Sequence, residues 1–263
     1  MSRYRPVLHP NLPQGRVKAV AIGESYLTLV GEAFRELDIE IIPVPSCSSV
    51  DVRVSGHADL TTHHLGGNSL IVSSDTYDET YIRLANSCGK FGLENWDIIK
   101  GAAKFDSKYP SDIPLNALRI GQILFCNVPH TDVRLLQFCE ENGIEIIHVN
   151  QGYARCSVCI VNEKAVITAD PGLADSMEKK GIDVLRIRRG YIDLPGYDHG
   201  FIGGASGKIS RDKLCFTGSL KDHPDYDSIE KFLYKRDVEP IILTERNCFD
   251  IGSIIPLIET IEE

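Results

Sequence analysis

The sequence lacks any apolar run near the roughly 20 residues that a helix needs to cross a bilayer. It is also short of positive charge, because 28 Lys and Arg stand against 37 Asp and Glu, giving a formal net charge of −9. Such a chain disfavours a nucleic-acid backbone or an anionic membrane surface as its partner. Residues 1–10 lack the apolar segment of a signal peptide. We therefore expect a cytoplasmic protein with neither a nucleic-acid nor a membrane partner.

Several familiar motifs are also missing. The sequence contains no dinucleotide fingerprint and no Ser-His-Asp spacing. The stretch Gly203–Lys208 resembles a phosphate-binding loop, but Ile202 and Ile209 stand where that motif needs Gly and Ser or Thr. A Gly-rich hairpin is the better interpretation of this stretch. The sequence therefore implies no cofactor.

The cysteines show neither a disulfide pattern nor a metal pattern. The chain has 8 cysteines in 263 residues, scattered and often inside apolar runs, which is typical of reduced, buried thiols. Cys156 and Cys159 have the spacing of a zinc pair, but no second pair follows, and on a strand their thiols would face opposite ways. His63 and His64 beside His57 could hold a metal, yet adjacent side chains diverge on a strand. The sequence predicts no metal site.

The sequence does contain a recurring junction between a helix and a strand, which we call the recurring phrase. In each copy, a polar helix end is followed by a residue that ends the helix and then by an acidic residue among branched aliphatic residues. Gly143 and Gly181 supply the left-handed conformation that ends a helix, and the aliphatic run favours a strand. The phrase occurs at 36–42, 141–147, 179–185 and 236–242. Such recurrence indicates a repeat architecture.

The repeat predicts five units of strand, strand, helix, strand (ββαβ) in a single α/β domain over residues 1–263. In the third unit we expect one strand over Ile120–Cys126. The N-terminal part offers a strand, helix and strand without an opening strand, whereas Cys248–Leu257 reads as an opening strand without the rest. The two termini are therefore expected to complete one shared unit. The units comprise approximately residues 56–110, 111–152, 153–197, 198–247, and 16–55 together with 248–263.

Five ββαβ units around a pseudo-fivefold axis resemble the five-bladed β/α propeller of the penteins, the guanidino-group-modifying enzyme (GME) superfamily. That superfamily includes arginine and agmatine deiminases, amidinotransferases and dimethylarginine hydrolases, and also the non-catalytic translation initiation factor six. His57-Ala58-Asp59 resembles its H-x-D motif, in which His is the acid/base and Asp holds a guanidinium. Arg155-Cys156-Ser157-Val158 resembles R-C-M-S, which carries the nucleophilic Cys. The chain is also similar to an uncharacterised bacterial family with this fold.

Two departures from that pattern bear on catalysis. Catalytic penteins carry their nucleophile in the last strand, where this chain places Gly252 two residues after Asp250. Cys156 lies in a different unit, and the superfamily's E-G-G-D stretch is absent. The resemblance therefore implies one of two functions. One is a hydrolase or transferase acting on C–N bonds of a guanidine-like or amidine-like small molecule, and the other is a non-catalytic pentein that binds a ligand or a protein partner.

The openings of the units converge on the pseudo-fivefold axis, so their polar residues are the candidate site. The resemblance implies a thiolate nucleophile, an acid/base histidine and carboxylates for a cationic ligand. We assign the nucleophile to Cys156 and the acid/base role to His57 or His199. The residues assigned to ligand binding are Asp59, Asp112, Asp198, Asp250 and Arg155.

Each assignment has a structural alternative. On a strand, Cys156 and Arg155 would face opposite ways, and the thiol could be buried and inert. His57 and Asp59 would share one strand face, and could form a local hydrogen-bonded pair. Asp250 could cap the closing strand.

Overall fold

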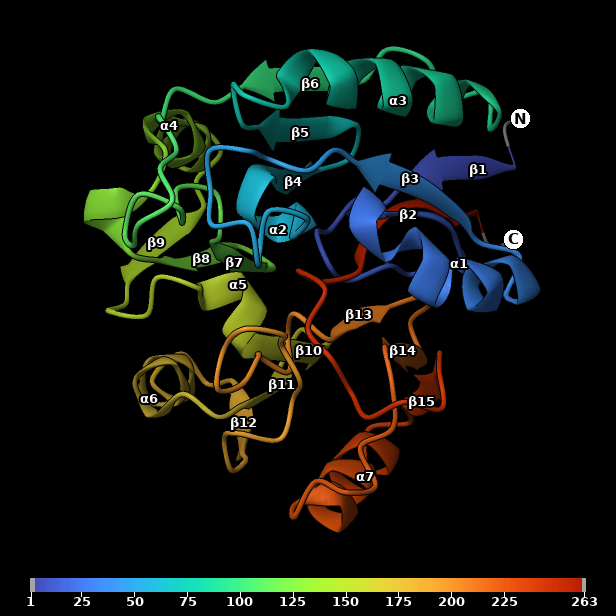
Figure 1. Ribbon diagram of the computed structural model, residues 1–263, viewed down its shortest axis with the longest axis vertical. Coiled ribbons are helices and arrows are strands. Elements are labelled where there is room, and N and C mark those ends of the chain that lie inside the picture. Colours follow the sequence, from blue (N-terminus) through green and yellow to red (C-terminus); the bar gives the residue numbers. More distant parts are fainter. Residues whose placement is uncertain (1–2, 262–263) are drawn as a thin grey trace.

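The computed structural model describes residues 3–261, whose strands form five small sheets. Figure 1 shows these sheets following one another around the middle of the molecule, with one long helix outside each. The terminal sheet has the order β1 (Tyr4–Pro6), β16 (Ile255–Thr260), β2 (Val17–Gly23), β3 (Glu40–Val44). The strands of the other sheets are β4 (Thr62–Gly66), β5 (Ser69–Val72) and β6 (Asp97–Lys100); β7 (Leu118–Ile120), β8 (Ile123–Cys126) and β9 (Glu145–His148); β10 (Val158–Asn162), β11 (Ala165–Thr168) and β12 (Asp183–Arg186); β13 (Ser206–Lys208), β14 (Lys213–Phe216) and β15 (Glu239–Ile242).

The four internal sheets share one connectivity. Their first two strands form an antiparallel hairpin, and the third joins the second in parallel after a helix. A parallel neighbour needs such a crossover, which explains why a helix always precedes the third strand. The helices are α1 (Leu27–Glu36), α2 (Ala58–Thr61), α3 (Tyr77–Gly89), α4 (Val133–Glu141), α5 (Ala154–Ser157), α6 (Pro171–Glu178) and α7 (Tyr226–Tyr234), with 3-10 turns η1 (Glu24–Tyr26) and η2 (Val128–His130).

The recurring phrase is the end of each long helix. One residue of every copy has a left-handed backbone, the third in the first three copies and the second in the last, with φ of 58° at Asp38, 65° at Gly143, 75° at Gly181 and 54° at Asp237. The amide of the next residue bonds a carbonyl five positions back, as in Ile182 N to Met177 O at 3.1 Å. These are the features of a Schellman cap. Gly92 (φ 68°) supplies the same cap after α3, where the sequence pattern was unclear.

The C-terminal strand β16 lies between β1 and β2, antiparallel to both. The pairs Pro6 with Ile258 and Ile255 with Ala21 set its register. The expectation that the termini complete one sheet is therefore confirmed. The predicted position of this strand, 248–257, was wrong by several residues, because residues 248–254 form the loop that reaches the molecule's centre. The single strand predicted over 120–126 was also wrong, since Gly121 (φ 55°) turns the chain between β7 and β8.

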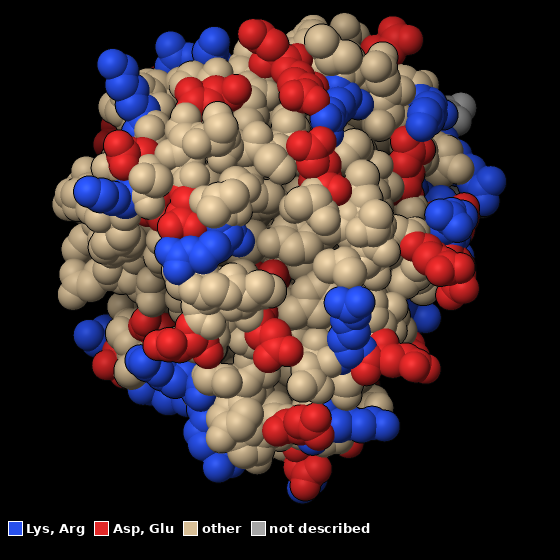
Figure 2. All heavy atoms as spheres, in the orientation of Figure 1, with Lys and Arg blue, Asp and Glu red and all other residues tan. Residues whose placement is uncertain are grey.

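Burial follows the strand and helix patterns. Strand β11 is buried along its whole length. Helix α1 buries Val30 and Phe34 against the terminal sheet, which contains β2. All 8 cysteines are buried and unpaired, as the composition predicted. Within residues 3–261 no helix is both long and apolar enough to span a membrane. Figure 2 shows acidic and basic side chains interspersed over the viewed face.

Glu259 connects the terminal segments and provides a test of this closure. Its carboxylate, 1% exposed, accepts bonds from Arg5 Nε at 2.9 Å and from the amides of Gln14 and Gly15 at 2.6 and 2.8 Å. Glu259→Gln leaves Arg5 without its counter-ion and places an amide against two N–H donors. We expect the free energy of unfolding to fall by about 3 kcal/mol, measured by urea denaturation. Glu239→Gln, at the exposed pair with Lys213, should cost less than about 1 kcal/mol. Equal losses in both variants would contradict the closure.

Candidate active site

Two short helices, not strands, present the candidate residues. His57 has an extended backbone at the start of α2, and Asp59 lies in that helix's first turn. Cys156 lies within α5, directly before β10. The predictions that depended on strand alternation were therefore wrong for His57, Asp59 and Cys156. Asp59 nevertheless lies close to His57, because both belong to the start of the same helical turn.

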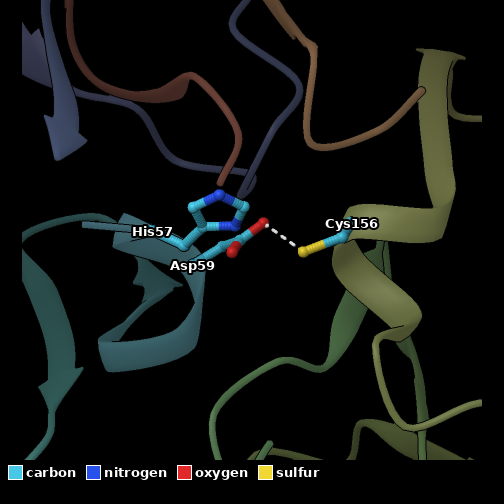
Figure 3. A group of neighbouring side chains, drawn as sticks. All are labelled: His57, Asp59 and Cys156. Atoms are coloured by element: carbon cyan, nitrogen blue, oxygen red, sulfur yellow. Dashed lines mark hydrogen bonds between the residues drawn. The ribbon is translucent and has the colours of Figure 1, made fainter. Parts of the chain in front are cut away.

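Asp59 and Cys156 meet although 97 positions separate them in the sequence. The Cys156 thiol donates to Asp59 Oδ2 at 3.0 Å, and Figure 3 shows His57 beside this contact. The Ser253 hydroxyl donates to the same carboxylate oxygen. Asn116 Nδ2 donates to Cys156 Sγ at 3.1 Å, and Asn116 Oδ1 accepts the Cys156 amide at 3.3 Å. The sulfur therefore has a fixed position.

A second carboxylate lies beside His57. Its Nδ1 lies 3.8 Å from Asp250 Oδ1, and both side chains are buried. The amides of Gly252 and Phe201 donate to Asp250, each at 2.9 Å. Burial raises the pKa of Asp250 to about 6 and, despite the nearby Asp59, lowers the pKa of His57 to about 4. At neutral pH the imidazole is therefore uncharged and able to accept a proton.

The thiol lies in an acidic environment. Burial, followed by the charges of Asp59 and Asp250, raises the pKa of Cys156 well above its ordinary value. Burial likewise raises the pKa of Asp59. Protein groups alone thus keep the sulfur protonated, and a cation bound nearby would favour the thiolate.

A cavity of about 230 Å³ opens over these groups. His57, Cys156 and Asp250 line it, and the remaining wall is mostly aromatic and aliphatic. The guanidinium of Arg53 lies 4.1 Å from the ring centre of Tyr197, which it supports from outside. The other lining residues are Val54, Leu60, Tyr153, Leu194, Tyr197, Asp198, His199 and Phe201.

The remaining predicted residues fall into separate places. His199 and the exposed Asp198 line the cavity wall. Asp112 is buried and accepts a hydrogen bond from the hydroxyl of Tyr153. It therefore contacts a residue of the cavity wall and does not itself line the cavity. Asp59 and Arg155 line a different, very small cavity of about 10 Å³. The buried Arg155 guanidinium, at 3.5 Å from Val158 O, therefore does not reach the larger cavity.

Sequence reasoning missed Asn116, Ser253 and Tyr153. Tyr153 stands two residues before Arg155 and could have been included with the motif. Asn116 and Ser253 carry no motif of their own, and only the fold brings them to Cys156 and Asp59. The ring of Tyr153 lies 6.0 Å from that of Phe201, so the two rings form one aromatic wall.

Gly252 is packed directly against His57. A Cβ at Gly252, whose φ is 73°, would lie 2.4 Å from both Cα and Cβ of His57. The Gly252 carbonyl also accepts the Asp59 amide at 3.1 Å. The position that the sequence resemblance led us to align with the pentein nucleophile therefore has no room for a side chain in this chain.

Two buried histidines that line the small cavity near Asp59, His63 and His64, should make stability depend on pH. Burial lowers the pKa of His63 to about 3 and that of His64 to about 4, from 6.5. Their contribution to stability is complete above pH 6.5 and is lost as the pH falls toward 4, because only the unfolded chain takes up the protons. We expect each histidine to lower the free energy of unfolding by about 1.4 kcal/mol per pH unit in that window.

Urea denaturation from pH 7 to 4 measures this slope. His63→Gln should reduce the slope by about 1.4 kcal/mol per pH unit, and Gln137→Asn, an exposed change that involves no titrating group, should leave it unchanged. Asp250 acts with the opposite sign, so the difference between each variant and the parent isolates the histidine. Identical slopes in both variants would contradict a neutral, buried His63.

Comparison with solved structures identifies the fold as that of the penteins. C. jejuni agmatine deiminase with bound substrate gives a TM-score of 0.56 at 10% identity, covering 97% of this chain and 96% of that chain. The inosamine-phosphate amidinotransferase of Streptomyces griseus gives 0.55 at 10% identity, covering 96% of each chain. An amidinotransferase of saxitoxin biosynthesis from Microseira wollei gives 0.53 at 11% identity, covering 93% of this chain and 92% of that chain. At these identities the likeness shows the fold alone.

Within that fold class, the chain belongs to the family of unknown function DUF6873, whose model matches residues 22–255. A search of curated proteins gives no match to this chain.

Proposed function

We propose that this protein is a cysteine-dependent hydrolase or transferase that cleaves a C–N bond of a small guanidine or amidine. Cys156 is the nucleophile, His57 and Asp59 move protons, and Asp250 with Asp198 attracts the cationic ligand. The observation that carries the proposal is the placement of Cys156, His57 and Asp250 on the wall of one cavity. The pentein neighbours, among them an agmatine deiminase and two amidinotransferases, support the reaction class.

In the proposed reaction, every proton transfer uses one of the groups that surround the Cys156 sulfur. Cys156 gives its proton to Asp59 across their 3.0 Å contact as the sulfur bonds to the amidino carbon. The C–N bond then breaks, and the amine departs with the proton that Asp59 held. Water, or an acceptor amine in a transferase, adds to the S-linked carbon while neutral His57 takes its proton. His57 returns a proton to the sulfur as the C–S bond breaks. In hydrolysis, the remaining proton on the urea-type product passes to the released amine and gives its ammonium form, whereas in transfer the new guanidinium keeps it.

Charge and shape both favour a cationic ligand. Asp250 is buried in the cavity wall, and a carboxylate there is stabilised by a bound cation. The faces of Tyr153, Tyr197 and Phe201 offer the negative potential that attracts planar cations. Binding such a cation would also lower the pKa of Cys156, so the ligand would activate the nucleophile that attacks it.

Alkylation tests the proposal. Chloroacetamidine carries the positive amidine, and iodoacetamide is a neutral reagent of similar size. We expect chloroacetamidine to modify Cys156 rapidly and stoichiometrically, with the other seven buried cysteines slow, as mapped by peptide mass spectrometry. Asp250→Asn should abolish the preference for the charged reagent, and His57→Ala should slow the reaction. Asp97→Asn, at an exposed position of β6 outside the cavity lining, is the control and should keep that preference.

Labelling of Cys156 no faster than that of the other cysteines would sink the enzyme proposal. The second candidate would then be a non-catalytic protein that binds a cationic ligand in the same cavity. The raised pKa of the thiol and the side-chain-free Gly252 favour it. Calorimetric binding of a guanidinium compound, lost in Asp250→Asn, would support that candidate.

We also infer that the five sheets are the blades of a five-bladed β/α propeller in one domain. The common hairpin-helix-strand connectivity supports this, and so does the insertion of β16 between β1 and β2. We propose the unit boundaries expected from the sequence for these blades, with 16–55 and the described residues from 248 to 261 sharing one blade.

A further inference from the structure

The cluster of His57, Asp59 and Cys156 has the shape of a metal site. One donor atom from each lies within 4.8 Å of the others, and all three residues are buried. In a proton relay the imidazole would stand between the thiol and the carboxylate. Here the thiol donates directly to Asp59, so the three groups form a compact triangle (Figure 3).

Two buried polar atoms of these three side chains have no hydrogen-bond partner among residues 3–261. They are His57 Nε2 and Asp59 Oδ1, on side chains that are only 3% and 1% exposed. A buried polar atom without a partner is energetically unfavourable, because its lost hydration is not replaced. Such atoms therefore indicate a ligand that completes them.

Two members of the cluster have hydrogen-bond partners outside it. Ser253 donates to Asp59 Oδ2. Asn116 donates to the Cys156 sulfur at 3.1 Å. Asp250 Oδ1 lies 3.8 Å from His57 Nδ1, beyond hydrogen-bonding distance but close enough to favour positive charge at this site.

We propose that His57, Asp59 and Cys156 bind a zinc ion. Sulfur, imidazole and carboxylate form a mixed donor set that zinc accepts, with bonds of about 2.0–2.3 Å in tetrahedral geometry. Donors up to 4.8 Å apart reach that geometry by small side-chain rotations. Three protein ligands leave a fourth position, and His57 and Cys156 direct it into the 230 Å³ cavity.

Binding converts the thiol to a zinc-bound thiolate and releases its proton to solvent. The sulfur is then a ligand and is withdrawn from attack on an amidino carbon. Zinc and a guanidinium ligand should therefore compete for one cavity. This inference stands independently of the proposed reaction, since metal binding is measured without turnover.

Cobalt(II) is the spectroscopic probe, because a cysteine thiolate gives it an intense near-ultraviolet charge-transfer band. We expect the full-length protein to bind one cobalt or zinc per chain, with that band, and bound metal to protect Cys156 from iodoacetamide. Cys156→Ser should remove the band, and Asp59→Asn should weaken binding. Asp250→Asn, which removes a negative charge 3.8 Å from His57 Nδ1, should weaken binding several-fold and keep the band. Asp97→Asn, at an exposed position of β6, should behave as the parent.

A protein that shows no thiolate band at saturating cobalt, or a band that persists in Cys156→Ser, would overturn the zinc site. Circular dichroism verifies that each variant is folded, and alkylation of Cys156 in the parent gives a second way to remove the ligand. Metal binding without chloroacetamidine labelling of the metal-free protein would leave the zinc site standing and reject the proposed reaction. Labelling of Cys156 by chloroacetamidine without metal binding would reject the zinc site and leave the proposed reaction standing.

Discussion

Cys156→Ser is expected to lower turnover of any guanidine that protects Cys156 from chloroacetamidine by about 10³-fold or more. The hydroxyl is a far weaker nucleophile at the same position, and Asp59 holds it as it held the thiol. The side chain is 2% exposed and nearly isosteric, so the fold should remain intact. Release of ammonia or amine, measured with the parent and the variant at equal concentration, gives the ratio.

Cys159→Ser is the matched control for this loss. Cys159 is buried three residues further on, in β10, and does not line the 230 Å³ cavity. Its replacement should leave turnover unchanged once the folded fraction is equal. Retention of more than a tenth of the parent rate in Cys156→Ser would reject the nucleophile and favour a binding function.

Gly252→Ala is expected to destabilise the protein by about 2–5 kcal/mol. The new methyl group would stand 2.4 Å from Cα and Cβ of His57, and the φ of 73° is unfavourable for any L side chain. Because the neighbouring atoms belong to α2, relief requires moving the segment that carries His57 and Asp59. Urea denaturation gives the loss, and Cys156 labelling should slow together with it.

Gly181→Ala separates backbone strain from overlap. Gly181 has nearly the same φ, 75°, but a Cβ there meets nothing within 4 Å. Its replacement should cost only about 1–2 kcal/mol, from the left-handed conformation alone. If both substitutions cost the same, Gly252 is not packed against His57, and the absence of a cysteine there has no steric cause. The comparison therefore tests whether packing against His57 is the reason that position 252 has no side chain.

The short motifs predicted which residues form the site but not how they are arranged. His57, Asp59 and Cys156 were found from short motifs, and these three residues do cluster. Their relative positions were not predictable, because alternation along an assumed strand gave directions that the helices α2 and α5 do not have. Arg155 belongs to the same motif as Cys156 and yet lines another cavity. A motif identifies residue types, whereas the backbone decides where each side chain points.

The sequence by itself determined the repeat and the capping. Helix ends at Asp38, Gly143, Gly181 and Asp237 follow from local backbone preference, and each commits the next residues to a strand. Local signals of this kind need no partner from elsewhere in the chain. They also predicted that the termini complete one sheet, since an unpaired strand at each end can only pair with the other.

Only the tertiary structure decided the chemistry. The contact of Asp59 with Cys156 spans 97 positions, and that of Ser253 with Asp59 spans 194. The shifts in pKa at His57 and Asp250 come from burial, which depends on the packing of several sheets around one point. No local pattern encodes such a distance or such a loss of solvent, because both arise only when separate units close around the same centre.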